Sequence, residues 1–441
     1  MKKLPTDRWT FYMPRSGFCV SHASWRSHFA ELNSVCSDDV GSSQGGSTMK
    51  YFCMPADFKK ETINAYDRLN ETYESKGSRV VETYGNVTVG DNFGSGRVLK
   101  QLPEVDFLAM KEYVEYSNEK GIAFSYTFNI PYWQNREFTK EGAFKLKEFL
   151  RHLYEIGVSD LTVSMPSFLD IVKWSGYDFK VKASAICHIT TPNKALAYKK
   201  MGIERIVVDE SVHRDFQTLK NIVKVFGENV EIIVNTMCHR NCVYRQFHYN
   251  ETGGDSFGLC NEVGVNFFEH KCLLQRYDTI SGLLKLGWVR PEDLHYYSDI
   301  GITYFKLQGR QHVGKGGHIK ALEAYLKESY DGNLMDLLDM FNPRYSFQVY
   351  IDNKKLDGYL EPYSRIAHFC KNDCTQCNYC DTYARKAIDY KKASEVVAYA
   401  KAFYNEHDQF KKLIDSLEPG EENRVNIGKE DMAIDFDFTR G

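Results

Sequence analysis

The chain has 441 residues, enough for one large domain and a smaller one. With 43% hydrophobic and 26% charged residues, its composition is typical of a globular protein. The formal net charge of −3 excludes a bulk electrostatic attraction to nucleic acid or to an anionic membrane, although a local basic patch could still bind RNA.

The cysteine content and the N-terminal sequence predict a cytoplasmic protein. The stretch MKKLPTDRWTFYMPRSGF lacks the apolar core of a secretory signal. No run approaches the ~20 apolar residues of a membrane span. Twelve cysteines without an export signal indicate a reducing compartment, where cysteine clusters bind metal more often than they form disulfides.

Residues 1–48 show no sustained hydrophobic period and are rich in Ser and Gly, which predicts an N-terminal extension or mobile arm. From residue 49 to residue 330, short apolar runs alternate with amphipathic segments. The apolar runs predict eight strands, at 50–56, 79–86, 122–129, 161–166, 180–186, 205–210, 231–237 and 303–309. Helix-like segments separate most of them, and two of these end at the C-cap glycines Gly157 and Gly227.

Eight strands with intervening helices over 49–330 predict a (β/α)8 barrel, a TIM-like fold, with a doubly wound open sheet as the alternative. In such a barrel the chemistry sits at the C-terminal ends of the strands. The polar residues at those ends are candidate ligand contacts or ordinary rim residues: Glu82, Tyr84, Asn86, Asn129, Ser164, Ser184, Asp209, Glu210, Asn235, Lys306, Gln308 and Arg310.

The segment 331–418 is predicted to be a cysteine-rich and helical C-terminal region. A short extended run over 347–363 precedes the stretch HFCKNDCTQCNYCDTY, and a helical stretch over 383–417 follows it. The acidic residues 419–441 are predicted to form a loose tail.

Eight of the twelve cysteines fall into two local groups. The first quartet follows the seventh predicted strand and consists of Cys238, Cys242, Cys260 and Cys272. The second quartet lies in the C-terminal region and consists of Cys370, Cys374, Cys377 and Cys380. Thiolates select iron–sulfur clusters or zinc, and neither quartet has the paired C-x2-C knuckles usual for zinc. The sequence therefore predicts an iron–sulfur cluster at each quartet, with zinc as the alternative.

Side chains that bind anions or transfer protons lie near the first quartet. Arg245 can bind a carboxylate or phosphate through two hydrogen bonds, and His248 can carry a proton near neutral pH, although both could instead serve the metal site itself. Lys306 and Arg310 face the same barrel mouth from the eighth predicted strand and could hold an anionic substrate.

A glycine-rich loop with Gly90, Gly94 and Gly96 follows the second predicted strand. Such a loop can present backbone N–H groups to a phosphate, and Arg97 is the natural anion partner beside it. A flexible barrel loop explains the same glycines equally well.

The stretch EIIVNTMCHRNC, the later Cys260 and Cys272, and the stretch GITYFKLQGR resemble the collagenase-like peptidase family, peptidase family U32, over residues 50–330. The chain departs from that family's pattern in three respects. Its first cysteine pair is closer, and Met237 and Gln308 stand where the family has Leu and Glu.

The resemblance implies a TIM barrel with a 4Fe–4S cluster held by the first quartet. Members of this family studied as enzymes resemble oxygen-independent hydroxylases that modify RNA bases or quinone precursors, with prephenate implicated as the oxygen donor. The expected function is an iron–sulfur-dependent modifying oxidoreductase that acts on an RNA base, a quinone precursor, a peptide or a small metabolite. An electron-donor protein is the expected partner.

Three alternatives stay open from the sequence. Cys370, Cys374 and Cys377 have the C-x3-C-x2-C spacing of a radical S-adenosylmethionine enzyme, but this motif follows the whole barrel and Cys380 adds a fourth thiolate. A U32-type peptidase is the second alternative, for which the sequence holds neither a G-x-S-x-G elbow nor an H-E-x-x-H motif. The third is a non-catalytic electron-transfer subunit that houses two clusters.

Overall fold

The computed structural model describes residues 48–90, 93–256, 267–315, 317–338 and 347–417. All of these residues fall in one compact unit that starts at Ser47. The predicted N-terminal arm and acidic tail lie almost wholly outside the described residues, as does Cys260 of the first quartet.

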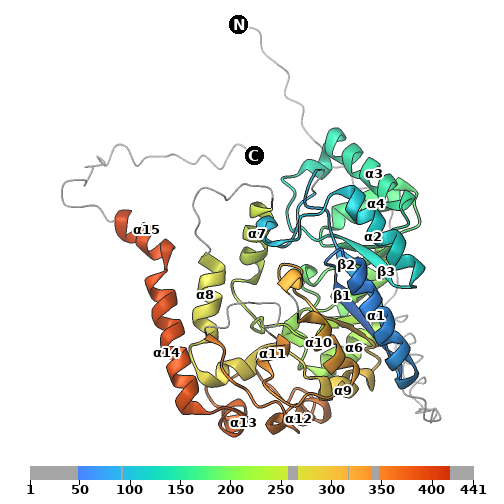
Figure 1. The fold of residues 1–441 in the computed structure, drawn as a ribbon. Helices are drawn as coiled ribbons and strands as arrows, with labels where there is room; N and C mark the ends of the chain where they lie inside the picture. The colour runs from blue at the N-terminus through green and yellow to red at the C-terminus, as the bar shows by residue number, and fades with distance from the viewer. Residues whose placement is uncertain (1–47, 91–92, 257–266, 316, 339–346, 418–441) are drawn as a thin grey trace, which may run out of the picture. The chain divides into compact units, whose positions relative to one another are not determined.

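Eight parallel strands form a closed barrel, in which every strand pairs with its neighbours in sequence order and β1 pairs with β8 (Figure 1). The strands are β1 (Lys50–Pro55), β2 (Ser78–Gly85), β3 (Ala123–Phe128), β4 (Asp160–Val163), β5 (Lys180–Ala183), β6 (Arg205–Val207), β7 (Val230–Ile233) and β8 (Tyr304–Lys306). This arrangement confirms the predicted (β/α)8 barrel and excludes the open sheet.

Helices follow the strands, and most of them cover the outside of the barrel. In the barrel they are α1 (Lys60–Tyr73), α2 (Phe107–Glu119), α3 (Lys140–Glu155), α4 (Pro166–Ser175), α5 (Pro192–Lys200), α6 (Phe216–Phe226), α7 (Arg245–Asp255), α8 (Phe267–Arg276), α9 (Leu294–Ser298) and α10 (His318–Leu326). Gly157 and Gly227 follow α3 and α6 with φ of 83° and 105°, a backbone conformation that strongly favours glycine. No described helix is long and apolar enough to cross a bilayer.

The C-terminal region contains α11 (Met335–Leu338), α12 (Glu361–Arg365), α13 (Tyr379–Ala387), α14 (Tyr390–Glu406) and α15 (Gln409–Leu417). Its buried residues Leu356, Tyr359 and Ile388 belong to the same hydrophobic core as the barrel. The predicted extended run over 347–363 is only partly right, because isolated bridges at Ile351 and Asp352 are followed by helical turns. Helix α14 packs beside α8 through a small apolar cluster (Figure 1).

A buried ion network fills part of the barrel interior, where bulky branched residues usually dominate. Lys182 on β5 pairs with Glu82 on β2 and, at 3.0 Å, with Glu231 on β7. Arg205 on β6 also pairs with both carboxylates, at 2.8 Å and 3.6 Å. Burial opposes ionisation of Glu231, but Lys182, Lys306 and Arg205 outweigh it and hold the pKa of Glu231 low. The network therefore ties four strands together through charge.

We expect Lys182→Met to lower the free energy of unfolding by about 3 kcal/mol or more, because two buried carboxylates then lose their shared cation. Lys145→Met is the matched control, since Lys145 forms an exposed pair with Glu141 and its loss costs less than about 1 kcal/mol. Urea unfolding under anaerobic conditions measures both. Equal losses for the two variants would contradict the structural role of the network.

Candidate active site at the barrel rim

The first quartet begins where the chain leaves the buried strand β7. Asn235 fixes this exit to the end of β8, since its side chain donates to the Gln308 carbonyl at 3.0 Å and accepts from the Gln308 N–H at 2.8 Å. Cys238 and Cys242 follow in the loop before α7. The loop is thereby held at the C-terminal rim of the barrel, where chemistry is expected.

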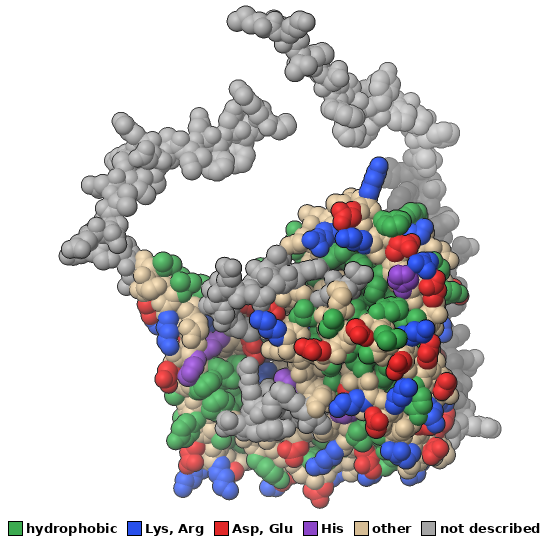
Figure 2. Space-filling model, turned by 45° about the horizontal axis from the view of Figure 1, so that its top comes forward, with side chains coloured by type: hydrophobic (Ala, Val, Ile, Leu, Met, Phe, Trp, Pro, Cys, Tyr) green, Lys and Arg blue, Asp and Glu red, His purple; other side chains and the backbone are tan. Residues whose placement is uncertain are grey.

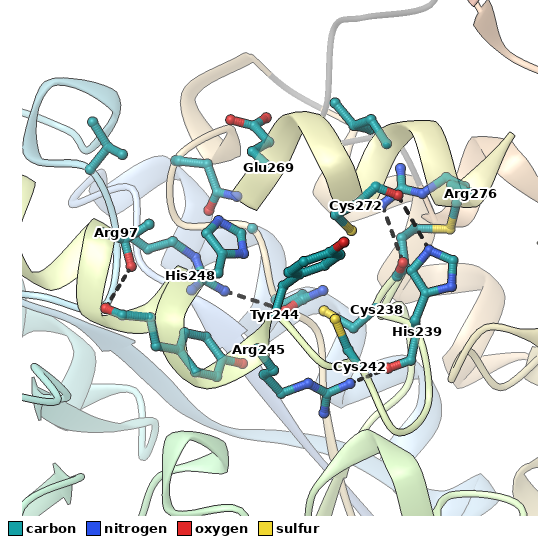
Figure 3. A pocket seen from close by; sticks show the side chains of 18 of the residues that line it. Arg97, Cys238, His239, Cys242, Tyr244, Arg245, His248, Glu269, Cys272 and Arg276 are labelled. Atoms are coloured by element: carbon teal, nitrogen blue, oxygen red, sulfur yellow. Dashed lines mark hydrogen bonds between the residues drawn. The ribbon is translucent and has the colours of Figure 1, made fainter. Parts of the chain in front are cut away.

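A cavity of about 240 Å³, here called the cysteine cavity, opens at this rim. Cys238 and Cys242 line it from the loop, and Cys272 lines it from α8. Figure 3 shows the sulfur atoms of Cys238 and Cys242 next to each other, with Cys272 reaching toward them from the helix. The structure thus brings together the three members of the first quartet that it describes.

The environment of these thiols combines burial with nearby positive charge. Burial raises the pKa of Cys238 to about 11, with Glu210 adding to the rise and Arg245 opposing it. Burial likewise raises the pKa of Cys272, which the charge of Arg276 lowers in part. Without a bound metal, these thiols resist ionisation even though guanidinium groups lie nearby. A cationic metal centre would stabilise their thiolate form, so the environment suits such a centre.

Arg245, predicted from the sequence as a substrate contact, is buried at the start of α7. Its guanidinium donates to Asp209 at 2.8 Å, to Glu210 and to the His239 carbonyl. Asp209 also lies 2.8 Å from Nδ1 of His188. Arg245 lines the cysteine cavity, yet its hydrogen bonds fasten the cysteine loop to the end of β6, so contact with substrate stays a prediction.

A second cavity, of about 40 Å³, lies in the barrel mouth and is here called the barrel-mouth cavity. Arg97, Lys306 and Arg310 line it, and no acidic residue of the described chain does. It shares Arg97, Tyr249 and Gln308 with the cysteine cavity, so the two spaces adjoin. The sequence-predicted candidates Arg97, Lys306 and Arg310 therefore come together in one cationic site next to the cysteines.

Arg310 is buried, and the partners of its guanidinium are neutral oxygens. It donates to Thr127 at 2.7 Å, to Ser95 at 3.1 Å, to Asn129 at 3.2 Å and to Asn86. Burial, together with the charge of Arg97, lowers the pKa of Arg310 to about 10. Since no carboxylate of the described chain pairs with it, its charge is available to an anionic ligand.

Lys306 is the second cation of this cavity, and its Nζ lies 3.9 Å from Glu231 and 3.7 Å from the centre of the Tyr84 ring. Burial lowers the pKa of Lys306 to about 8, although Glu231 works in the opposite direction. Glu231 is already shared with Lys182 and Arg205. Lys306 is therefore only partly neutralised.

His248 lines the cysteine cavity from α7 and is half-buried. Burial lowers the pKa of His248, and the charge of Glu269 on α8 counteracts part of the effect. Its imidazole is neutral at pH 7 and can accept a proton.

In the glycine-rich loop two backbone N–H groups are already engaged within the protein, and a phosphate cradle there stays a prediction. The N–H of Gly96 donates to Asn129 at 3.2 Å, and the N–H of Ser95 donates to Ser256 at 3.0 Å. A Cβ on Gly96 would lie 2.8 Å from the Asn129 carbonyl, which explains why glycine stands there. The loop thus packs into the barrel mouth, and Arg97 is its contribution to the site.

Glu269 and Arg276 line the cysteine cavity and were missed by the sequence reasoning. Both lie on α8 with Cys272, three residues before it and four residues after it. Residues at these spacings share one face of a helix, so the helical period around Cys272 was the signal that could have identified them.

One group of potential metal ligands lies outside both quartets. Cys53, Glu82 and Glu231 have ligand atoms within 4.8 Å of one another inside the barrel. Lys182 and Arg205 already neutralise the two carboxylates, so a cation there would meet two buried positive charges. The group belongs to the ion network, and Glu82 serves it rather than the rim.

Acidic and basic side chains are interspersed over the face shown in Figure 2. This distribution agrees with the small net charge of −3. Cationic side chains instead gather inside the barrel mouth, where Arg97, Lys306 and Arg310 line a cavity that no acidic residue of the described chain lines.

The model of peptidase family U32 matches residues 87–262, which include β3 to β7 and the first three cysteines of the first quartet. An archaeal protein described as "Uncharacterized protease MJ1657", from Methanocaldococcus jannaschii, is 29% identical over 343 residues. The match covers 76% of this chain and 98% of that protein.

Among solved structures, the U32 peptidase Mk0906 matches 60% of this chain and 95% of its own length, at 15% identity and a TM-score of 0.43. A CutC protein from Streptococcus agalactiae, described as a putative copper homeostasis protein, matches 47% of this chain at 14% identity and a TM-score of 0.30. The family model and the archaeal relative confirm the resemblance of this chain to peptidase family U32.

Proposed function

We propose that this protein is an iron–sulfur-dependent modifying enzyme, hydroxylase-like in chemistry, whose substrate or co-substrate carries a carboxylate or another small anionic group. The proposal is carried by one observation, that the cysteine cavity and the barrel-mouth cavity adjoin. A cavity lined by Cys238, Cys242 and Cys272 adjoins a smaller one lined by three cations and no acid of the described chain.

The donor set of the first quartet fits an iron–sulfur cluster. Soft thiolates are its usual ligands, and the guanidinium groups of Arg245 and Arg276 offset negative charge there. Zinc usually pairs C-x2-C knuckles across a longer gap, and the first quartet lacks that spacing, which favours a cluster.

Cys238, Cys242, Cys260 and Cys272 would hold the cluster, which supplies redox and Lewis-acid chemistry when bound. Arg97, Lys306 and Arg310 would bind the anionic group of the ligand. The barrel-mouth cavity of about 40 Å³ is much smaller than the cysteine cavity of about 240 Å³, so only the anionic group of the ligand is placed there. The rest of the ligand then lies in the cysteine cavity, beside the neutral imidazole of His248, which can accept a proton.

A dicarboxylate such as prephenate, expected from the family resemblance as an oxygen donor, has the anionic groups that this arrangement requires. The modified substrate is then an RNA base, a quinone precursor, a peptide or a small metabolite. An electron-donor protein would complete the reaction.

The archaeal relative is described as a protease, which makes peptidase activity the second candidate. An anaerobic assay with unstructured peptides separates the two. Cleavage that survives Cys272→Ala would favour the peptidase, because the proposed enzyme needs the first quartet intact.

We expect the second quartet to hold a separate cluster, so that anaerobically purified protein contains about eight irons per chain. Cys272→Ala and Cys377→Ala should each lower the content to about four irons. Cys187→Ser is the control, since Cys187 is a buried thiol apart from both quartets. Iron analysis with electron paramagnetic resonance (EPR) measures this, and zinc in place of iron would overturn the proposal.

Malonate, as a dicarboxylate probe, is expected to bind in the barrel mouth. Gln308→Glu should weaken this binding about tenfold or more, because the new carboxylate would pair with Arg97, which now donates to the Gln308 amide at 3.4 Å. Gln217→Glu, a half-buried position on α6, adds the same charge elsewhere and is the control. Isothermal titration calorimetry measures both, and equal affinities for the two variants would place the anion elsewhere.

Malonate binding should also depend on pH through Lys306, whose pKa lies at about 8. The ammonium form predominates below that pH, so binding is strongest there and weakens about tenfold per pH unit above it. Calorimetry between pH 6.5 and 9.5 measures the slope of the malonate affinity against pH, and Lys306→Met should remove this slope. A slope that persists in Lys306→Met would assign the titration to another group.

A further inference from the structure

The second quartet lies against the loop that carries the first quartet. Arg240 stands between Cys238 and Cys242 in the sequence, and its two terminal nitrogens lie 3.5 Å and 3.6 Å from Sγ of Cys370. Its Nε donates to the Lys285 carbonyl at 3.1 Å, which fixes the direction of the side chain. One arginine therefore belongs to the first site by its backbone and to the second by its guanidinium.

The four cysteines of the second quartet are unequally placed. Cys370 and Cys380 are half-buried and face the protein, where the Tyr359 hydroxyl lies 3.3 Å from Sγ of Cys380. Cys374 and Cys377 are exposed. The site therefore has an inner side that is hydrogen-bonded by the protein and an outer side that solvent or a partner can reach.

A short backbone strip, 284–287, connects the two quartets a second time. The N–H of Gly287 donates to the Cys238 carbonyl at 3.1 Å, and His239 forms a bridge with Leu286. At the other end of the strip, the Leu284 carbonyl accepts from the Tyr359 hydroxyl at 2.7 Å. Hydrogen bonds and a few covalent bonds thus lead from Cys238 to the tyrosine beside Cys380.

The charge of Arg240 acts directly on the second quartet. Its guanidinium places a positive charge and two N–H-bearing nitrogens 3.6 Å and 3.5 Å from Sγ of Cys370. Hydrogen bonds and positive charge at cluster sulfurs raise the reduction potential, because they stabilise the more negative reduced state.

We propose that Arg240 couples the two cysteine sites, as a positioning residue that raises the reduction potential of the second site and holds it in contact with the first. The inference rests on the proposed iron–sulfur occupancy of both quartets. A one-electron carrier protein gives up one electron at the exposed Cys374 and Cys377 side. With clusters bound at both sites, the second site would accept that electron and pass it to the first, so that the carrier is oxidised by one electron and the first site is reduced by one.

The test is a potentiometric EPR titration of anaerobically purified full-length protein with dithionite. Arg240→Gln removes the charge but keeps a hydrogen-bond donor. We expect it to shift the one-electron reduction equilibrium of the second site at least tenfold toward the oxidised form, which corresponds to about 59 mV. Arg240→Lys keeps the charge and should shift it less.

Arg365→Gln is the matched control, because Arg365 is an exposed arginine near the second quartet that pairs with Glu361. It should leave the potential unchanged. In the fully reduced wild type, we also expect EPR lines broadened beyond the sum of the spectra of Cys272→Ala and Cys377→Ala, since two nearby spins interact.

The outcomes separate this inference from the proposed function. An unchanged potential in Arg240→Gln, or a spectrum equal to the sum of the two single-site spectra, would overturn the coupling while the iron count of about eight still supports the proposed function. A wild-type count of about four irons that Cys272→Ala abolishes would overturn the coupling alone, whereas zinc in place of iron would overturn both. Loss of the second cluster in Arg240→Gln but not in Arg365→Gln would support the contact between Arg240 and the second quartet. The reduction potential of the second site is then measured in Arg240→Lys.

Discussion

Inside the barrel, Lys182 and Arg205 share the two buried carboxylates of Glu82 and Glu231, whereas the guanidinium of Arg310 at the mouth has neutral partners. A buried charge is costly unless it is paired. The described barrel mouth therefore carries positive charge that its own side chains do not balance. An anionic ligand would supply the balance, and the position of that charge decides where such a ligand is held.

The cysteine loop is built on the same rim. Arg245 fastens it to the end of β6, and Asn235 fastens it to the end of β8, so the thiols and the cations keep a fixed relation to one another. The C-terminal region adds to this frame, because its tyrosines and its cysteines pack against the loop and the strip that follows it. The cysteine cavity therefore adjoins three cations on one side, and the second quartet contacts the cysteine loop through Arg240.

All eight strands were predictable because each is a short apolar run bounded by turn residues, and their number implied a closed barrel. The position of Lys306 and Arg310 at the mouth followed from the same rule. Other features depend on tertiary contacts that no local pattern encodes. Glu82 joins the interior network instead of the rim, and Arg240 reaches Cys370 across 130 residues of sequence.

X-ray absorption at the iron and zinc edges, on anaerobically purified full-length protein, distinguishes an iron–sulfur cluster at the first quartet from a zinc ion. We expect iron bound by sulfur, with scattering from neighbouring iron atoms, and a reduced iron signal in Cys272→Ala. Zinc with four sulfur neighbours and no metal–metal scattering, unchanged in Cys272→Ala, would contradict this expectation.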